Sequence, residues 1–115
     1  MTIERFEDIV AWQKAKILTI LVYKKFQHCR DFNFCNQIQR AVVSIMNNIA
    51  EGFERRGDKE LRNFLYIAKG SCGEVRSMLL LASELQYVSD VDCNAMSTLA
   101  QEVSRLLSGF IKTLQ

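Results

Sequence analysis

The chain has 115 residues, of which 49% are hydrophobic and 24% are charged, and its formal net charge is +2. This length and composition are typical of one globular domain, and they exclude both a disordered polymer and a strongly cationic protein. Proline is absent, so long helices are possible along almost the whole chain.

The first eight residues are acidic and lack the basic flank and apolar core of a signal peptide. The longest apolar stretch, residues 17–23, is far shorter than the roughly 20 residues that a membrane-spanning helix needs. We therefore expect a cytoplasmic protein with no membrane partner.

Apolar residues recur at steps of three and four in four segments, which predicts helices over residues 6–27, 34–55, 59–87 and 90–114. Gly57 and Asp58 supply a stop and an N-cap signal before the third segment, and Ser89, Asp90 and Asp92 offer N-caps for the fourth. The stripe of the first segment consists of Ala11, Ala15, Leu18, Val22 and Phe26. That of the second consists of Ile38, Ala41, Val42, Ile45, Ile49 and Phe53.

The third segment has the cleanest register, and short loops make consecutive helices antiparallel neighbours. The sequence therefore predicts an all-α protein, an antiparallel up-down-up-down four-helix bundle formed by one domain over residues 1–115. The stripe of the third segment consists of Leu61, Leu65, Ala68, Cys72, Val75, Leu79 and Ala82. That of the fourth consists of Met96, Leu99, Val103, Leu106, Phe110 and Leu114.

Two of the four segments carry more apolar residues than one core stripe uses. In the third segment, two glycines lie within one turn, which indicates that another backbone approaches there, because glycine inside a helix costs up to about 1 kcal/mol relative to alanine. Isolated surface hydrophobics are normal, but clustered ones mark an interface. We expect self-association into a homo-oligomer through Ile9, Ile17, Ile20, Leu21, Tyr66, Gly70, Gly73 and Leu81.

The second segment has a polar side rich in serine and asparagine, which are poor helix formers on a simply solvated face. We interpret it as a hydrogen-bonded network against the third segment, with an Arg40–Glu74 ion pair; a surface that contacts a ligand or RNA is the alternative. The predicted network consists of Gln37, Arg40, Ser44, Asn48, Glu51, Ser71 and Glu74.

Three motifs occur in order: FEDIVAWQKA over 6–15, QxxRAxxSIxxNIAEG over 37–52 and FLxxAxGSxxE over 64–74. Together they closely resemble the four-helix-bundle proteins encoded within intervening sequences of bacterial 23S ribosomal RNA genes. One departure is the loop before the second helix, where that family often has a proline and this chain reads DFNF over 31–34.

The resemblance implies a bacterial homopentamer, a ring of identical subunits that is not known as an enzyme and whose cellular role is undefined. A similar bundle serves as the accessory protein of diversity-generating retroelements, where a basic surface binds nucleic acid and a reverse transcriptase. We therefore expect the oligomer to act as a scaffold or adaptor. Binding of RNA or another nucleic acid is the alternative function.

The charge distribution bears on that alternative. Five basic residues and no acidic one lie between Ile9 and Arg30, whereas the basic cluster around Arg55 is interleaved with acids and reads as a solvated turn. No RNA-recognition signature is present, so binding would be phosphate-driven and salt-sensitive. Candidate nucleic-acid contacts are Lys14, Lys24, Lys25, Arg30, Arg55 and Arg56.

Four cysteines and one histidine are the remaining chemistry-bearing residues. His28, Cys29 and Cys35 are close in sequence, but a zinc site needs four well-spaced ligands, so free thiols in a reducing compartment are the favoured interpretation. No phosphate loop, nucleophile elbow or Glu-x-x-His pair occurs. We expect no catalytic, metal or cofactor site.

Overall fold

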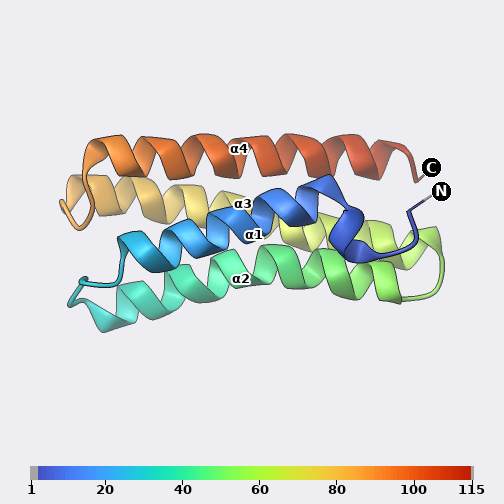
Figure 1. Cartoon of the computed structure of the whole chain (residues 1–115), viewed down its shortest axis with the longest axis horizontal. Coiled ribbons are helices and arrows are strands. Elements are labelled where there is room, and N and C mark those ends of the chain that lie inside the picture. The colour runs from blue at the N-terminus through green and yellow to red at the C-terminus, as the bar shows by residue number, and fades with distance from the viewer. Residues whose placement is uncertain (1–2, 115) are drawn as a thin grey trace.

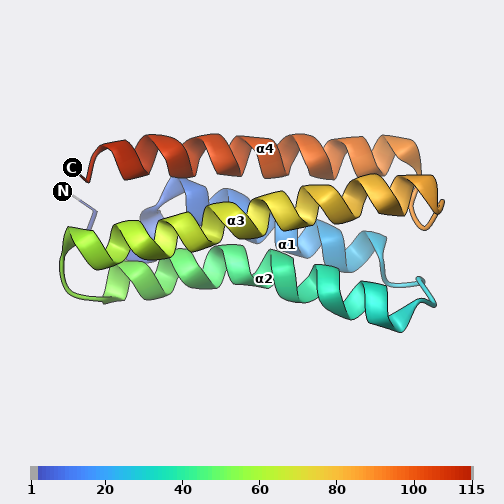
Figure 2. The ribbon, with the colours of Figure 1, turned by 180° about the vertical axis from the view of Figure 1, so that it is seen from behind.

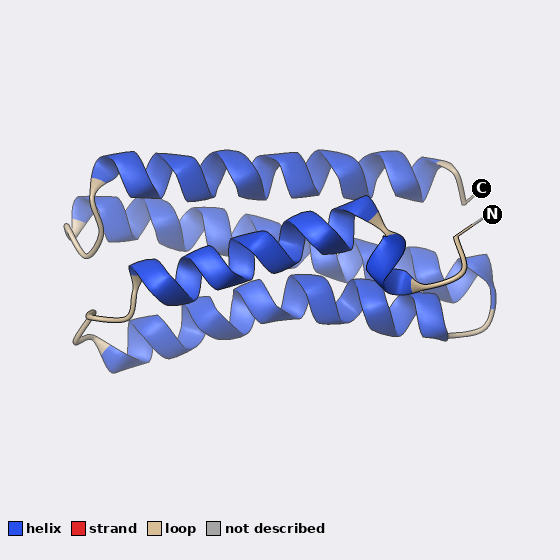
Figure 3. Ribbon diagram, in the orientation of Figure 1, coloured by secondary structure: helices blue, strands red, loops and turns tan. Residues whose placement is uncertain are grey.

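The structure, a computed structural model, describes residues 3–114 and consists of four long helices after one short turn of 3-10 helix (Figures 1 and 3). No strand occurs within residues 3–114. The elements are η1 (Phe6–Asp8), α1 (Val10–Lys25), α2 (Phe32–Glu54), α3 (Gly57–Glu84) and α4 (Asp90–Lys112). The predicted all-α, up-down-up-down bundle is confirmed.

Each long helix packs beside two of the other long helices. Within the described residues, α1 lies beside α2 and α4, and α3 lies beside the same two helices, so α1 and α3 are diagonally opposite. Figure 1 accordingly shows α1 in front, and Figure 2, the view from behind, shows α3 in front. The molecule measures 43 × 21 × 19 Å, so α1 and α3 lie on opposite long faces of a narrow bundle.

The core follows the predicted stripes on α1, α2 and α3, with Phe53 half-buried at the end of α2. On α4 the predicted stripe was wrong in part. The buried positions there are Cys93, Ala100, Leu107 and Ile111 together with the expected Met96 and Val103, and Leu114 is buried just after the helix. Leu99, Leu106 and Phe110 are half-buried beside the core. Adjacent apolar pairs such as Leu106–Leu107 fit two registers, and only packing against α1 and α3 selects one of them.

The first helix begins later than predicted. Residues Phe6–Asp8 form the separate turn η1, and Ile9 is extended (φ −74°, ψ 121°) before α1 starts at Val10. The Phe6 and Trp12 ring centroids lie 5.3 Å apart in an edge-to-face arrangement. The side chain of Gln13 also donates a hydrogen bond of 2.9 Å to the backbone oxygen of Glu7. The entry into α1 is thereby folded back onto the helix.

Capping residues set the starts of α2 and α4. The carboxylate of Asp31 accepts from the backbone N–H of Phe34 (3.2 Å), so α2 begins two residues earlier than predicted. Ser89 caps α4 through the N–H of Asp92 (3.2 Å). The N-cap of α3 is Arg56 without a side-chain bond, so the prediction of Asp58 as its cap was wrong. Gly57 stands in that turn with φ +83°, a conformation that other residues rarely adopt.

Candidate interaction surfaces

Three aliphatic side chains are exposed on the outward side of α1. Val10 and Ile17 are each 52% exposed and Ile20 is 45% exposed, while the half-buried Leu21 packs beside the core. The prediction that Ile9 belongs to the interface was wrong, because the extended backbone after η1 turns this side chain into the core, where it is 3% exposed. We call the exposed residues Val10, Ile17 and Ile20 the α1 face.

Apolar side chains are exposed on the outward side of α3 as well, with Tyr66 56% and Leu81 50% exposed. Gly70 and Gly73 are exposed on the same helix, and a Cβ added at either would meet nothing within 4 Å. The subunit's own packing therefore gives no reason for glycine at these two positions. We call Tyr66, Gly70, Gly73 and Leu81 the α3 face.

Half of the six basic residues predicted to contact nucleic acid form ion pairs within the subunit. Lys14 pairs with Glu102 (Nζ–Oε2 3.7 Å) and Lys25 pairs with Asp92 (Nζ–Oδ1 3.4 Å), so both lysines link α1 to α4. Arg55 forms an ion pair of 2.9 Å with Glu51. The acid-free run on α1 is thus partly neutralised by carboxylates of α4, a helix that lies far away in sequence.

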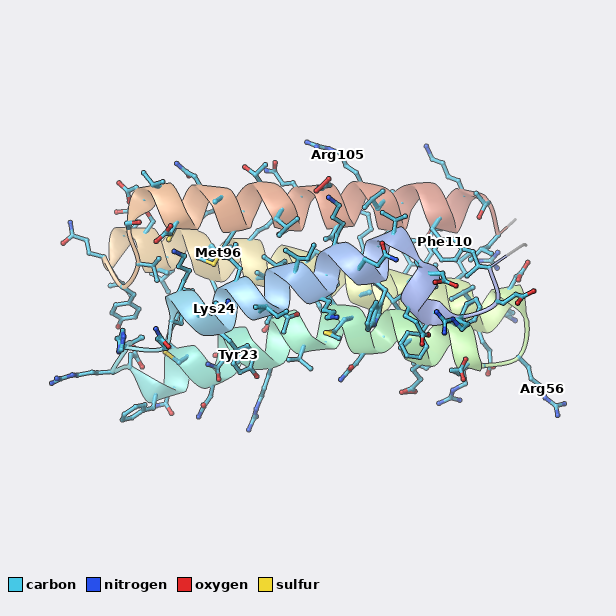
Figure 4. The ribbon with its side chains drawn as sticks, viewed as in Figure 1. Tyr23, Lys24, Arg56, Met96, Arg105 and Phe110 are labelled. Atoms are coloured by element: carbon cyan, nitrogen blue, oxygen red, sulfur yellow. The ribbon has the colours of Figure 1, made fainter. Side chains whose placement is uncertain are left out.

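The other basic candidates are exposed at the surface. Lys24, Arg30 and Arg56 form no ion pair with a carboxylate of residues 3–114. Arg56 extends away from the turn between α2 and α3 (Figure 4). Arg30 and Lys24 lie toward the opposite end of the bundle, so the structure does not bring the candidate contacts together into one patch.

The predicted polar network forms only in its middle part. The hydroxyls of Ser44 and Ser71 lie 3.0 Å apart across α2 and α3. The Asn48 amide donates to the backbone oxygen (2.8 Å) and the hydroxyl (2.9 Å) of Ser44. Gln37 and Glu51 are exposed, and Glu51 turns to Arg55 instead. This network fixes the axial register of α2 against α3.

The predicted Arg40–Glu74 ion pair was wrong. Both side chains are exposed, and none of the ion pairs within residues 3–114 joins them. The two positions are close to level with each other, because Arg40 precedes Ser44 by four residues and Glu74 follows Ser71 by three on an antiparallel helix. The guanidinium of Arg40 is consequently left on the surface of α2.

A polar surface that the sequence interpretation missed lies where α1 meets α2. Tyr23, Asn36, Gln39, Arg40 and Val43 line a shallow hollow of about 320 Å³, which we call the amide hollow. Asn33 and Gln37 extend it along α2 beside Arg40. The sequence signal was the run of amides on α2; the prediction assigned Gln37 and Arg40 to contacts with α3 and gave Asn33, Asn36 and Gln39 no role.

The cysteines are free thiols, three of them buried. Burial raises the pKa of Cys72 to about 12 and also raises the pKa of Cys93. Burial and the neighbouring Cys29 thiol raise the pKa of Cys35 to about 12. These three thiols are therefore protonated and weakly nucleophilic near neutral pH. Within residues 3–114, no three histidine, cysteine or acidic side chains come together as a metal-binding group.

None of the helices described combines the length and the hydropathy that a bilayer span requires. The fold and its surfaces place the chain among small antiparallel four-helix-bundle proteins. A solved structure shares this fold at a TM-score of 0.84 and 22% identity, covering 89% of this chain and 98% of its own. It is a protein of unknown function from the S23 ribosomal protein family of Bacteroides thetaiotaomicron.

The model of the 23S rRNA-intervening sequence protein family matches residues 7–109 of the chain. The chain belongs to this family, as the three motifs in its first three helices predicted. No curated protein matches the chain.

Proposed function

We propose that the protein is a non-enzymatic scaffold or adaptor that works as a ring-like homo-oligomer. The observation that carries this proposal is the pair of apolar faces on diagonally opposite helices. Clustered exposed apolar residues mark interaction sites. The α1 face and the α3 face point in opposite directions, so one subunit can offer both to two different neighbours.

Contact of the α1 face of one copy with the α3 face of the next is a heterologous interface. Such a contact builds a closed ring when its rotation closes and an open filament when it does not. Family membership supports a ring of five subunits. The open space over Gly70 and Gly73 supports a close approach by the helix of a neighbour, since no group of the same subunit fills it.

Charge supports the same pairing of faces. Helix α1 carries four lysines and no acidic residue, and Lys24 is exposed and unpaired with the described carboxylates. Helix α3 carries four acidic and four basic residues, and it exposes Glu74 and Glu84. Opposite charges beside an apolar contact favour α1 against α3 over α1 against α1, where lysines would meet lysines.

Size-exclusion chromatography with light scattering tests the assembly. The wild-type chain should elute as a closed oligomer of defined mass, and the substitutions Ile17→Asp on the α1 face and Tyr66→Asp on the α3 face should each yield monomers. Val91→Asp is the matched control, because Val91 is 77% exposed on α4, outside both faces. A monomeric wild-type chain at micromolar concentration would refute the proposal.

Mixing the two variants identifies the geometry of the contact. The Ile17→Asp subunit keeps its α3 face and the Tyr66→Asp subunit keeps its α1 face, so a mixture should form one-to-one heterodimers and stop there. An isologous contact of α1 with α1 would instead leave the Tyr66→Asp variant able to dimerise with itself. The double variant should join neither partner.

A second candidate function is RNA binding, which the exposed Lys24 favours, since it forms no ion pair with a carboxylate of residues 3–114. A symmetric ring repeats that charge around its axis and strengthens its field. The interaction should weaken steeply as salt rises, because phosphate contacts release counterions. Retention of a structured RNA at low ionic strength and its release at higher salt is the expected result.

A further inference from the structure

The amide hollow differs from the rest of the surface in composition. It is lined by an aromatic ring, two side-chain amides, one guanidinium and Val43, and two further amides, Asn33 and Gln37, continue it along α2. Tyr23 is 44% exposed, and Figure 4 places it where α1 lies against α2. Asparagine is a poor helix former, so Asn33 and Asn36 on this face favour a role in a contact over mere solvation.

The hollow is also free of acidic residues. No acidic residue occurs in α1 or in residues 32–50 of α2. The nearest carboxylates along α2 have other partners: Asp31 caps the helix and accepts from the Tyr87 hydroxyl (2.7 Å), and Glu51 pairs with Arg55. Glu74 on α3 is the one carboxylate close to level with Arg40, and the two form no ion pair.

Three of the four lysines of α1 are less suited than Arg40 to hold an anion, and the fourth, Lys24, is exposed and forms no ion pair with a carboxylate of residues 3–114. Lys14 and Lys25 are tied to carboxylates of α4, and the ammonium of Lys16 lies 5.7 Å from the centre of the Trp12 ring. A ligand phosphate would have to displace Glu102 or Asp92 to reach the first two. Arg40 requires no such displacement, and a guanidinium offers a planar set of donors that fits a phosphate.

We infer that the amide hollow between α1 and α2 is a binding site for single-stranded RNA. The guanidinium of Arg40 holds a backbone phosphate, the ring of Tyr23 stacks on a base, and the amides of Asn36 and Gln39 hydrogen-bond to base edges. Single strands fit this chemistry because their unstacked bases expose both faces and edges, which a duplex hides.

This site rests on the second candidate function, RNA binding, and it is compatible with the proposed ring. The subunit contact uses the α1 and α3 faces, whereas the amide hollow lies on the side of α1 turned toward α2. Each subunit would therefore keep its hollow open, and a ring would present one copy per subunit to a single strand.

Fluorescence anisotropy with a labelled polyuridine of roughly 15 nucleotides at low salt tests the site, since single-strand sites span about 4–16 nucleotides. Arg40→Gln should weaken binding about tenfold and lower the salt slope by about one, the value expected for one lost phosphate contact. Tyr23→Leu, which keeps the apolar bulk but removes the ring, should weaken binding at least about fivefold.

Arg105→Gln is the matched control, because it removes the same charge from an exposed position on α4 that extends away from the bundle (Figure 4). Glu74→Gln should strengthen binding, because it removes the carboxylate nearest in register to Arg40. Circular dichroism should stay unchanged in all four variants, because these side chains are exposed. Elution volume should stay unchanged in Arg40→Gln, Tyr23→Leu and Arg105→Gln, whose side chains lie outside the α1 and α3 faces.

The possible outcomes distinguish a failure of the amide hollow as the binding site from a failure of RNA binding itself. If the wild-type chain binds no polyuridine and no structured RNA at low salt, both RNA binding and this site are refuted. If the wild-type chain binds but Arg40→Gln and Arg105→Gln weaken binding equally, RNA binding stands and the amide hollow is refuted. Equal affinity for a duplex of the same length, unaffected by Tyr23→Leu, would contradict recognition of single strands.

Discussion

Two interfaces inside the bundle are built in different ways. Between α2 and α3, Gly52 allows a close backbone approach, because a Cβ placed there would lie 2.6 Å from Cβ of Phe64. Further along the same interface, the Ser44 and Ser71 hydroxyls meet and Asn48 joins them. Between α1 and α4, the polar contacts are instead two ion pairs whose side chains are each at least 35% exposed.

The difference concerns what fixes the position of each helix. Close packing and half-buried hydrogen bonds are short-ranged, so they tie α2 and α3 to one axial register. Exposed ion pairs between long side chains tolerate small shifts and contribute little, typically below about 1 kcal/mol. The α2–α3 interface should therefore dominate stability, and the α1–α4 interface should respond to salt.

The largest effect on stability is expected from Gly52→Ala. The added methyl group clashes with Phe64 and comes within 3.2 Å of Leu61 Cδ1. Overpacking of this kind typically costs about 1–3 kcal/mol, and a gain in helix propensity of up to about 1 kcal/mol offsets it only in part. We expect a loss of about 2 kcal/mol in the free energy of unfolding, measured by urea denaturation.

Gly109→Ala is the control for that measurement, since a Cβ there meets nothing within 4 Å. It should leave stability unchanged or raise it by up to about 1 kcal/mol through helix propensity alone. A Gly52→Ala variant as stable as Gly109→Ala would show that α2 and α3 are not held in close contact.

A smaller effect is expected from Ser44→Ala, because this hydroxyl joins both Ser71 and Asn48. Its loss should cost about 1 kcal/mol, and Ser71→Ala should cost less because Ser44 keeps the Asn48 donor. The double variant should lose less than the sum of the two single losses, since both substitutions remove the same bond. Strict additivity in urea denaturation would contradict the contact.

The smallest effect is expected from the α1–α4 ion pairs. Lys14→Met and Lys25→Met should each lower the free energy of unfolding by at most about 0.5 kcal/mol at low salt. The difference from the wild-type chain should vanish at about 1 M salt, where the screening length falls to about 3 Å. A loss as large as that of Gly52→Ala, unaffected by salt, would reverse the comparison of the two interfaces.

The sequence by itself determined the number of helices, their antiparallel order, the core stripes of α1 to α3 and the family. These features depend on local periodicity, on loop length and on motifs, all of which are written along the chain. It also identified Ile17, Ile20, Tyr66 and Leu81 as surplus apolar residues, and the structure places all four on the surface.

Only the tertiary structure decided which side chains from different helices meet. The inward turn of Ile9 depends on η1, and the register of α4 depends on its packing against α1 and α3. The sequence likewise could not show that Lys14 and Lys25 reach carboxylates on α4 while Arg40 stays apart from Glu74. Contacts between helices depend on axial offsets and side-chain directions, which the hydrophobic periodicity of each helix does not determine. The amide hollow, which joins Tyr23 of α1 to the amides of α2, exists only because two helices pack at one such offset.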